Sequence, residues 1–271
     1  MTEMQAKLLD MLAWFDAFCR ENGLRYYALG GTLLGAVRHE GFIPWDDDVD
    51  VGMPRKDYER LARLMGSRIH DGYVLETEYS EDPKFCYPFT KLYDTGTTLE
   101  ENVSTGLKRG LFLDIFPLDG IGNGRQPDLK WFRKIKHRNQ FYLARICAVR
   151  KGRSCLKNLA VVLAKTLPDR MADNRTMRIR ISEMCRKYGF DDCRWAGSLL
   201  GNWWEKELMP REIFGEPKEY LFEGHRILGV EDAEGYLTAI YGDWRSLPPE
   251  EKRATHHDFI LCDLHRSYLN N

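Results

Sequence analysis

The chain has 271 residues and is 43% hydrophobic, enough for a full core in one large domain or in a domain with an elaboration. Its 40 Lys+Arg and 41 Asp+Glu residues give a net charge of -1, which excludes a uniformly basic or acidic protein. No signal peptide is predicted, because no basic region is followed by an apolar core at the start. No stretch approaches the ~20 apolar residues of a membrane span.

Charge is unevenly distributed along the chain. Residues 125–187 carry 18 Lys+Arg against 4 Asp+Glu, and the remainder carries 22 against 37. Such asymmetry predicts an electrostatically specialised face. The seven cysteines are an odd number without a paired framework, which indicates free thiols and a cytoplasmic protein.

The first part of the chain predicts helices and strands in alternation. Apolar residues at three- and four-residue steps indicate an amphipathic helix, and period-two or short apolar runs indicate strands. In chain order we expect a helix at 4–20, a strand at 24–29, a turn at 30–32, a short helix at 33–38, a strand end at 49–52, a helix at 54–65 and strands at 73–79, 86–93 and 111–116.

The second part changes in character. Residues 128–188 are basic and helical by pattern, with breaks at Gly152 and Pro168. A helix near 232–241 and a turn-rich segment at 242–249 follow. We therefore predict a catalytic core at 1–124, a basic helical insertion at 125–200 and a C-terminal part at 201–271 that packs on the core.

The run at residues 44–51, Pro-Trp-Asp-Asp-Asp-Val-Asp-Val, is the most informative in the sequence. In a strand, alternate side chains share a face, so Asp48 and Asp50 point one way and Val49 and Val51 the other. The Cα atoms of the two aspartates would lie roughly 6.6 Å apart. That span can serve two divalent ions about 3.5–4 Å apart, and carboxylate oxygens favour Mg²⁺ or Mn²⁺.

Asp114 is the natural third carboxylate. It lies in the otherwise apolar segment 111–116. A buried carboxylate without a partner is very costly there, so it requires a cation or several hydrogen-bond donors. A metal shared with the first two aspartates would supply that cation.

The turn Gly30-Gly31-Thr32 precedes these carboxylates. Glycines between a strand and a helix let backbone N–H groups approach a phosphate, and a helix N-terminus favours the anion. Arg38 follows in the predicted short helix and could hold phosphate oxygens with its planar side chain. A Gly-Gly pair alone is usually a plain turn, and an Asp-rich run is usually a solvated loop or a cap. Their occurrence in this order favours a catalytic site.

Segments 29–39 and 41–50 resemble the signature of the LicD family, which includes bacterial phosphocholine transferases and is related to the fukutin-related ribitol-phosphate transferases. Further similarity lies at 91–94, 114–119, 241–243, 247–253 and 256–257. The resemblance implies an α+β, nucleotidyltransferase-like fold, with a small mixed sheet flanked by helices. It also implies transfer of phosphocholine, or a similar group, from CDP-choline to a sugar hydroxyl, with release of CMP.

The resemblance also implies roles for individual residues. It makes Asp48, Asp50 and Asp114 the metal ligands. It makes Gly30 and Gly31 the turn on the phosphate side of the donor, and we group Thr32, Arg38 and Lys91 with them as donor-binding candidates. By fold analogy Asp114 is the first choice for the base that deprotonates the acceptor, and His256 or His257 is the second.

The identity of the alcohol stays open at this stage. A choline head group would fit an aromatic cage, for which Trp45, Tyr87, Tyr93, Trp203 and Trp204 are candidates. Most of these rings would individually be core or surface packing, and ethanolamine or another alcohol is not excluded.

The basic segment at 125–187 has two interpretations. It could hold an anionic acceptor, such as teichoic acid or a lipid-linked glycan at the inner face of the membrane, or it could be a solvated helical lid. Nucleic acid is not expected, because no binding motif accompanies the charge.

Two other functions also remain open. A nucleotidyltransferase that places NMP on a small molecule is disfavoured by the Ile43-Pro44-Trp45 lead-in. An inactive glycan-binding relative is disfavoured by the intact acidic triad.

Overall fold

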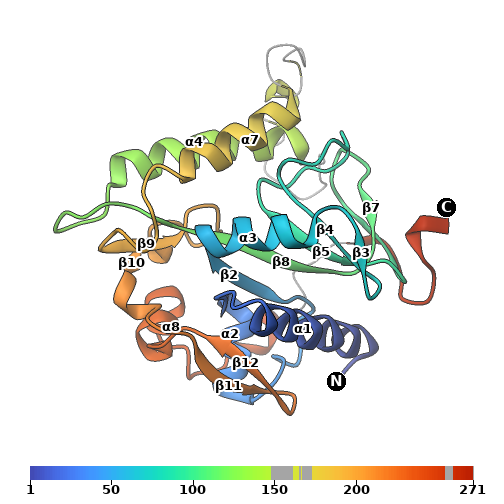
Figure 1. Ribbon diagram of the computed structural model, residues 1–271, viewed down its shortest axis with the longest axis horizontal. Coiled ribbons are helices and arrows are strands. Elements are labelled where there is room, and N and C mark those ends of the chain that lie inside the picture. The colour runs from blue at the N-terminus through green and yellow to red at the C-terminus, as the bar shows by residue number, and fades with distance from the viewer. Residues whose placement is uncertain (148–160, 165, 167–172, 254–258, 271) are drawn as a thin grey trace.

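A large mixed β-sheet forms the centre of the protein, with helices packed above and below it (Figure 1). The computed structural model describes residues 1–147, 161–164, 166, 173–253 and 259–270. The predicted breaks at Gly152 and Pro168 lie outside these residues. The α+β class predicted from the sequence is confirmed.

Six α-helices have assigned bounds in the described part of the chain. They are α1 (Glu3–Glu21), α2 (Gly30–His39), α3 (Arg55–Met65), α4 (Leu129–Ile146), α7 (Asn174–Cys185) and α8 (Ala233–Tyr241). Short 3₁₀ helices follow at η1 (Trp204–Glu207), η2 (Arg211–Ile213), η3 (Glu250–Lys252) and η4 (Tyr268–Asn270).

The strands form two sheets. Their bounds are β1 (Tyr27–Ala28), β2 (Asp50–Pro54), β3 (Ile69–His70), β4 (Tyr73–Glu76), β5 (Thr90–Asp94), β6 (Thr98–Glu101), β7 (Lys108–Arg109), β8 (Phe112–Gly120), β9 (Trp195–Ser198), β10 (Met209–Pro210), β11 (Lys218–Phe222), β12 (His225–Gly229) and β13 (Phe259–Asp263). The main sheet has the order β11-β12-β1-β2-β8-β5-β4-β3, and β9 and β10 extend it from the end of β8. The second sheet has the order β13-β6-β7.

The main sheet is mixed, as predicted, but larger than the small sheet expected. Two neighbouring pairs are parallel, β1 with β12 and β2 with β8, and the other pairs are antiparallel. The additional strands come largely from the second half of the chain. In particular, β9 lies within the predicted helical insertion 125–200 and pairs with the end of β8.

Helix α1 forms where its apolar periodicity predicts it. Thr2 caps its N-terminus in a capping box with Gln5, which satisfies backbone donors that the helix itself leaves unpaired. The predicted apolar stripe, which includes Leu8, Leu12 and Phe15, is fully buried. The helix therefore anchors the N-terminal segment on the sheet.

Three of the local predictions that differ from the structure concern the segments around Gly30 and Asp48. The strand expected at 24–29 is limited to β1, at Tyr27–Ala28. Gly30 and Gly31 form the first residues of α2 instead of a separate turn, because Leu29 adopts the extended N-cap conformation directly before them. Asp48 lies just before β2, which begins at Asp50.

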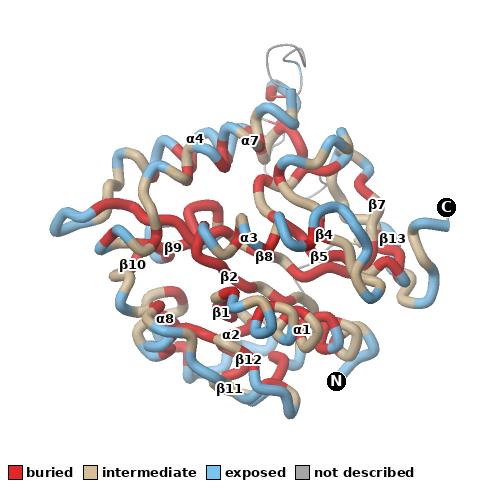
Figure 2. Tube along the Cα trace, viewed as in Figure 1, coloured by how far each residue is buried: buried red, intermediate tan, exposed pale blue. Residues whose placement is uncertain are grey.

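The parallel pair β2 and β8 lies at the centre of the sheet and is buried along most of its length (Figure 2). Val49 and Val51 are buried, as predicted for the inward face of this segment. Helix α3 packs against β2 and β8, and α1 packs against β8 and β12. These contacts fix the backbone that carries the predicted carboxylates.

Helices α4 and α7 pack side by side in a layer of their own (Figure 1). Their apolar faces form a second core, which includes Phe132, Tyr142 and Ile181. Arg178 of α7 is fully buried and donates hydrogen bonds to the carbonyl oxygens of Glu78 (2.9 Å), Phe85 (2.7 Å) and Ser80. The helix is thus fastened to the loop that follows β4.

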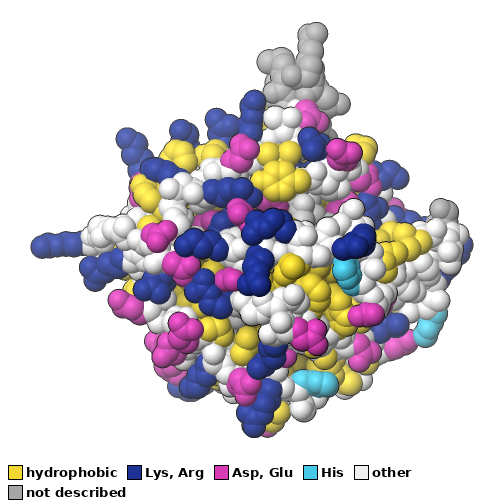
Figure 3. All heavy atoms as spheres, in the orientation of Figure 1, with side chains coloured by type: hydrophobic (Ala, Val, Ile, Leu, Met, Phe, Trp, Pro, Cys, Tyr) yellow, Lys and Arg dark blue, Asp and Glu magenta, His cyan; other side chains and the backbone are white. Residues whose placement is uncertain are grey.

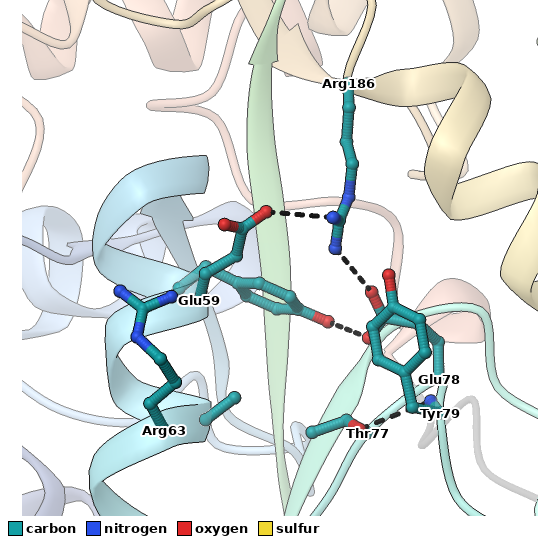
Figure 4. A pocket seen from close by; sticks show the side chains of 8 residues that line it. Glu59, Arg63, Thr77, Glu78, Tyr79 and Arg186 are labelled. Carbon is teal, nitrogen blue, oxygen red and sulfur yellow. Dashed lines mark hydrogen bonds and ion pairs between the residues drawn. The ribbon is translucent and has the colours of Figure 1, made fainter.

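A polar network continues this attachment toward α3. The Glu78 carboxylate is fully buried and accepts hydrogen bonds from Tyr58 (2.7 Å) and Ser182 (2.6 Å). The guanidinium group of Arg186, just after α7, lies 3.1 Å from the carboxylate of Glu59 and 3.8 Å from the carboxylate of Glu78. These residues line a cavity of about 290 Å³ (Figure 4). The helical layer is therefore attached to α3 and to the loop after β4 through the buried Glu78 carboxylate and the partly exposed Arg186.

Candidate active site

The first wall of the candidate site is the junction of α2 and β2. The N–H of Leu29 donates to the carbonyl of Asp50 (3.0 Å), and the N–H of Asp50 donates to Thr32 Oγ1 (2.9 Å). A Cβ atom at Gly31 would lie 2.4 Å from Asp46 Oδ2, so only glycine permits the carboxylate of Asp46 to approach the helix so closely. The first turn of α2 and the acidic segment therefore form one unit.

The second wall is formed by three strands in register. Asp50 on β2 pairs with Asp114 on β8, and Asp114 pairs with Lys91 on β5. Residues paired in register point to the same face of a sheet, so these three side chains meet on one side. Asp48, two residues earlier, lines the same cavities as Asp50. The structure thus brings the three predicted carboxylates together.

Lys91 neutralises part of this charge. It is 1% exposed, and its Nζ lies 3.1 Å from Asp114 Oδ1 and 3.4 Å from Glu101 Oε2. The ammonium also lies over the rings of Tyr87, at 3.9 Å from the centroid, and Phe112. Lys91 therefore already has two carboxylate partners within the protein, and it lines the site beside Asp114.

Asp50 and Asp114 are destabilised in their charged form. Burial, and then the neighbouring charges of Asp48, Asp114 and Asp46, raise the pKa of Asp50 well above its ordinary value. Burial raises the pKa of Asp114 to about 6, although the ion pair with Lys91 opposes the shift. Accumulated negative charge of this kind, with one ammonium group beside it, favours a further cation.

The carboxylates lie between two cavities. The smaller, of about 300 Å³, extends from Asp114 and Lys91 toward α4 and the segment before η1. The larger, of about 910 Å³, extends from the first turn of α2 toward the segment after α8. The two cavities share Gly30, Asp48, Asp50, Asn202 and Trp203. A group held at Asp48 and Asp50 would therefore be accessible from both sides.

A divalent cation fits this donor set if two carboxylates bind it and water and substrate phosphates supply its other ligands. Among the residues that the structure describes, no three His, Cys, Asp or Glu side chains are already grouped as a metal site. Mg²⁺, however, is commonly held by one or two carboxylates and takes its remaining ligands from water and substrate phosphates. Asp48 and Asp50 could provide the carboxylates. Asp114 Oδ1 is buried and makes no hydrogen bond within the described residues, although it is ion-paired with Lys91.

Three of the residues predicted on the donor side lie at the larger cavity, and two of these already donate hydrogen bonds within the protein. Gly30, Gly31 and Arg38 line it. The Gly30 N–H already donates to the hydroxyl of Tyr236 (3.2 Å), and Arg38 donates to the carbonyl of Trp244 (2.8 Å). Thr32 uses its hydroxyl to hold the Asp50 backbone. The predicted bases His256 and His257 lie outside the described residues.

The five aromatic candidates do not form one cage. Trp45 and Trp203 line the larger cavity, where Tyr241 and Trp244 join them. Tyr87 lines the smaller cavity. Tyr93 is fully buried in the core, and Trp204 is 39% exposed and lines neither cavity.

Several residues at the site carry no signal in the sequence. Glu101, Asn139, Glu207 and Tyr236 line the smaller cavity. Burial raises the pKa of Glu207 to about 7, and its Oε1 accepts a hydrogen bond from the N–H of Trp203 (2.7 Å). These residues come from β6, α4, η1 and α8, and only the tertiary fold brings them to the carboxylates.

The basic segment is partly structural. Lys136, Arg145 and Arg178 are at most 7% exposed, and each donates to backbone carbonyl groups. The exposed Arg133 pairs with Glu205 at 2.9 Å. On the face drawn in Figure 3, Lys and Arg side chains lie over the α4 and α7 side of the molecule, with acidic side chains among them. A simple charge count therefore overstates the cationic surface available to a ligand.

One structural result bears on membrane association. None of the helices in the described ranges is both long enough and apolar enough to cross a bilayer.

Comparisons with known proteins identify the family of the chain. Residues 23–145 match the family model for the LicD/FKTN/FKRP nucleotidyltransferase domain. The lipopolysaccharide cholinephosphotransferase LicD of Haemophilus influenzae is 32% identical over 260 residues, which cover 94% of this chain and 95% of that protein. The human ribitol 5-phosphate transferase FKRP is 49% identical over 45 residues, which cover 17% of this chain and 9% of that protein.

Proposed function

The chain belongs to the LicD family of phosphotransferases, and on that basis we propose that it transfers phosphocholine, or a similar phosphoryl-alcohol group, to a glycan hydroxyl. The donor is a cytidine-diphosphate alcohol such as CDP-choline, and CMP is released. The acceptor is a cell-surface glycan or its lipid-linked precursor. The Haemophilus relative aligns with almost the whole chain, and its name supports both the phosphocholine group and the glycan acceptor.

The proposed reaction is a displacement at the phosphorus atom that carries the alcohol. The oxygen of the acceptor hydroxyl forms the new bond to phosphorus, and the bond from phosphorus to the CMP oxygen breaks with its electron pair on CMP. The hydroxyl proton passes to a base, for which Asp114 is our first candidate. Asp48 and Asp50 would hold Mg²⁺ or Mn²⁺, which when bound neutralises the charge of the diphosphate.

One observation carries this proposal beyond the family assignment. Asp50 and Asp114 are register partners on adjacent parallel strands, and Asp48 and Asp50 line both cavities. A transfer reaction requires two substrates to meet at one phosphorus atom. Carboxylates placed at the boundary of two cavities fit that requirement better than carboxylates at the end of a single pocket.

The test is incubation of the protein with CDP-choline, Mg²⁺ and a lipopolysaccharide or teichoic acid acceptor, followed by ³¹P NMR and mass spectrometry. We expect CMP and a phosphocholine-modified glycan, with no product in EDTA. A CMP-labelled acceptor would instead indicate nucleotidyl transfer. No turnover with any CDP-alcohol, despite intact fold and added metal, would support an inactive glycan-binding relative.

A further inference from the structure

The smaller cavity has a polar end that the proposed reaction does not yet use. Asn139, on α4, is 4% exposed and lines this cavity, and its Oδ1 is buried without a hydrogen-bond partner among the described residues. A buried amide oxygen that lacks a partner destabilises the protein. Its presence on a cavity wall indicates a ligand that donates a hydrogen bond there.

The neighbouring groups at this end are also polar. Ser198, from β9, is 4% exposed and lines the cavity beside the Glu207 carboxylate. Glu207 in turn holds the backbone of Trp203, one of the residues that both cavities share. The polar end is therefore connected structurally to the boundary at Asp48 and Asp50.

The charge of the cavity restricts its occupant. Among the described residues that line it are five carboxyl groups, from Asp48, Asp50, Glu101, Asp114 and Glu207, against the single ammonium of Lys91. An anionic nucleotide would be repelled from its interior. The occupant must therefore be neutral or cationic away from the carboxylate boundary.

A quaternary ammonium group fits this cavity less well than a sugar. It has no N–H or O–H group to donate to Asn139 Oδ1. The ring of Tyr87 already has a cation over it, since Lys91 Nζ lies 3.9 Å from its centroid. Sugar hydroxyls can donate to Asn139 and accept from Ser198, and the apolar face of a sugar ring can pack on Phe89 and Phe116, whose ring centroids are 4.5 Å apart.

We propose that the smaller cavity is the acceptor subsite, in which Asn139 binds a hydroxyl group of a neutral sugar and α4 sets acceptor specificity. This inference rests on the proposed function. The larger cavity then holds the donor, with its diphosphate near the first turn of α2 and its alcohol or base among the tryptophan rings. The reacting hydroxyl reaches phosphorus across Asp48 and Asp50, on the side opposite the donor.

The experiment uses the full chain with Mg²⁺, CDP-choline and the methyl glycosides of glucose, galactose and mannose. Binding of each glycoside is measured by saturation-transfer NMR, and CMP release is measured with and without glycoside. The variants are Asn139→Ala, which removes the amide, and Leu143→Phe, which narrows the cavity from the same helix. Gln140→Ala, an exposed change on α4, is the matched control.

We expect at least one glycoside to bind and to accelerate CMP release. Asn139→Ala should lower kcat/KM for that glycoside about tenfold, the loss expected for one hydrogen bond, and Leu143→Phe should lower it at least as much. The KM for CDP-choline should stay within about twofold, and Gln140→Ala should resemble the wild type.

Three results would overturn the inference. They are failure of all the glycosides to bind the wild-type protein, unchanged glycoside binding in both cavity variants, and a raised CDP-choline KM in place of weaker glycoside binding. Failure of the proposed function has a different signature, namely absence of CMP release from the wild type. Glycoside binding that depends on Asn139 would still support a sugar subsite in that case.

Discussion

Asp50 should reduce the stability of the folded protein, so Asp50→Asn should stabilise it while abolishing turnover. Asp50 and Asp114 are register partners on adjacent strands, which places their Cα atoms about 4.8 Å apart. Two like charges about 5 Å apart repel by roughly 3 kcal/mol at an effective permittivity of ~20. Lys91 and solvent reduce this repulsion, so we expect a gain of about 1–3 kcal/mol in the free energy of unfolding.

The stability difference between Asp50→Asn and the wild type should depend on pH. The pKa of Asp50 is raised in the folded state by burial and by Asp48, Asp114 and Asp46. A raised acid pKa destabilises the fold only above the unfolded-state value, near 3.9, where the unfolded chain releases its proton more readily. The stability difference between Asp50→Asn and wild type should therefore be small below about pH 4 and should grow as the pH rises toward the folded pKa.

The assay is urea unfolding at about pH 4 and about pH 8, with Asp10→Asn, an exposed change on α1, as the control. Added Mg²⁺ should stabilise the wild type more than Asp50→Asn and so reduce the difference. The reasoning is wrong if Asp50→Asn is less stable than wild type at about pH 8 with an unchanged m-value. It is also wrong if the difference is the same at both pH values.

Three further outcomes are expected. Arg178→Met should lower the free energy of unfolding, measured by urea titration, by about 3 kcal/mol, because buried carbonyl groups lose their donor. The control is Arg175→Met, which removes an exposed donor to the same loop and should change the free energy of unfolding by less than about 0.5 kcal/mol. Gly31→Ala should reduce turnover by about 100-fold or more with the fold retained by circular dichroism, because the new Cβ displaces the Asp46 carboxylate; near-normal turnover would contradict this close approach. Removal of divalent metal with EDTA should abolish CMP release and lower the unfolding temperature, and both should recover with Mg²⁺; activity that persists in EDTA would exclude the metal proposal.

Local patterns predicted the parts of the site that are close in sequence. The alternation of Asp48, Val49, Asp50 and Val51 correctly indicated which side chains are buried in the core. Asp114 was recognisable because a carboxylate interrupts an apolar strand. Both signals depend on the period of a strand, which is a property of a few consecutive residues.

The remaining parts of the site depend on which strands and helices become neighbours. Asn139 and Glu207 lie on α4 and η1, and no short-range pattern relates them to Asp50. Strands β9 to β12 are two to five residues long, too short to show a period. The basic count at 125–187 does not by itself locate the surface charge, because composition does not distinguish the fully buried Arg178 from a surface cation.

The parallel pairing of β1 with β12 has a consequence for biosynthesis. Ala28 pairs with Gly229, about two hundred positions later, and Tyr236 on α8 then holds the N–H of Gly30. A nascent chain that has left the ribosome only as far as residue 145, the end of the segment that matches the family model, lacks both partners. One edge of its strand β1 is therefore unpaired. Such long-range closure is slow and exposes strand edges in the meantime. We therefore expect the carboxylates of Asp48, Asp50 and Asp114 to acquire their final geometry only after α8 has left the ribosome, so that a fragment ending near residue 200 would be inactive and prone to aggregation.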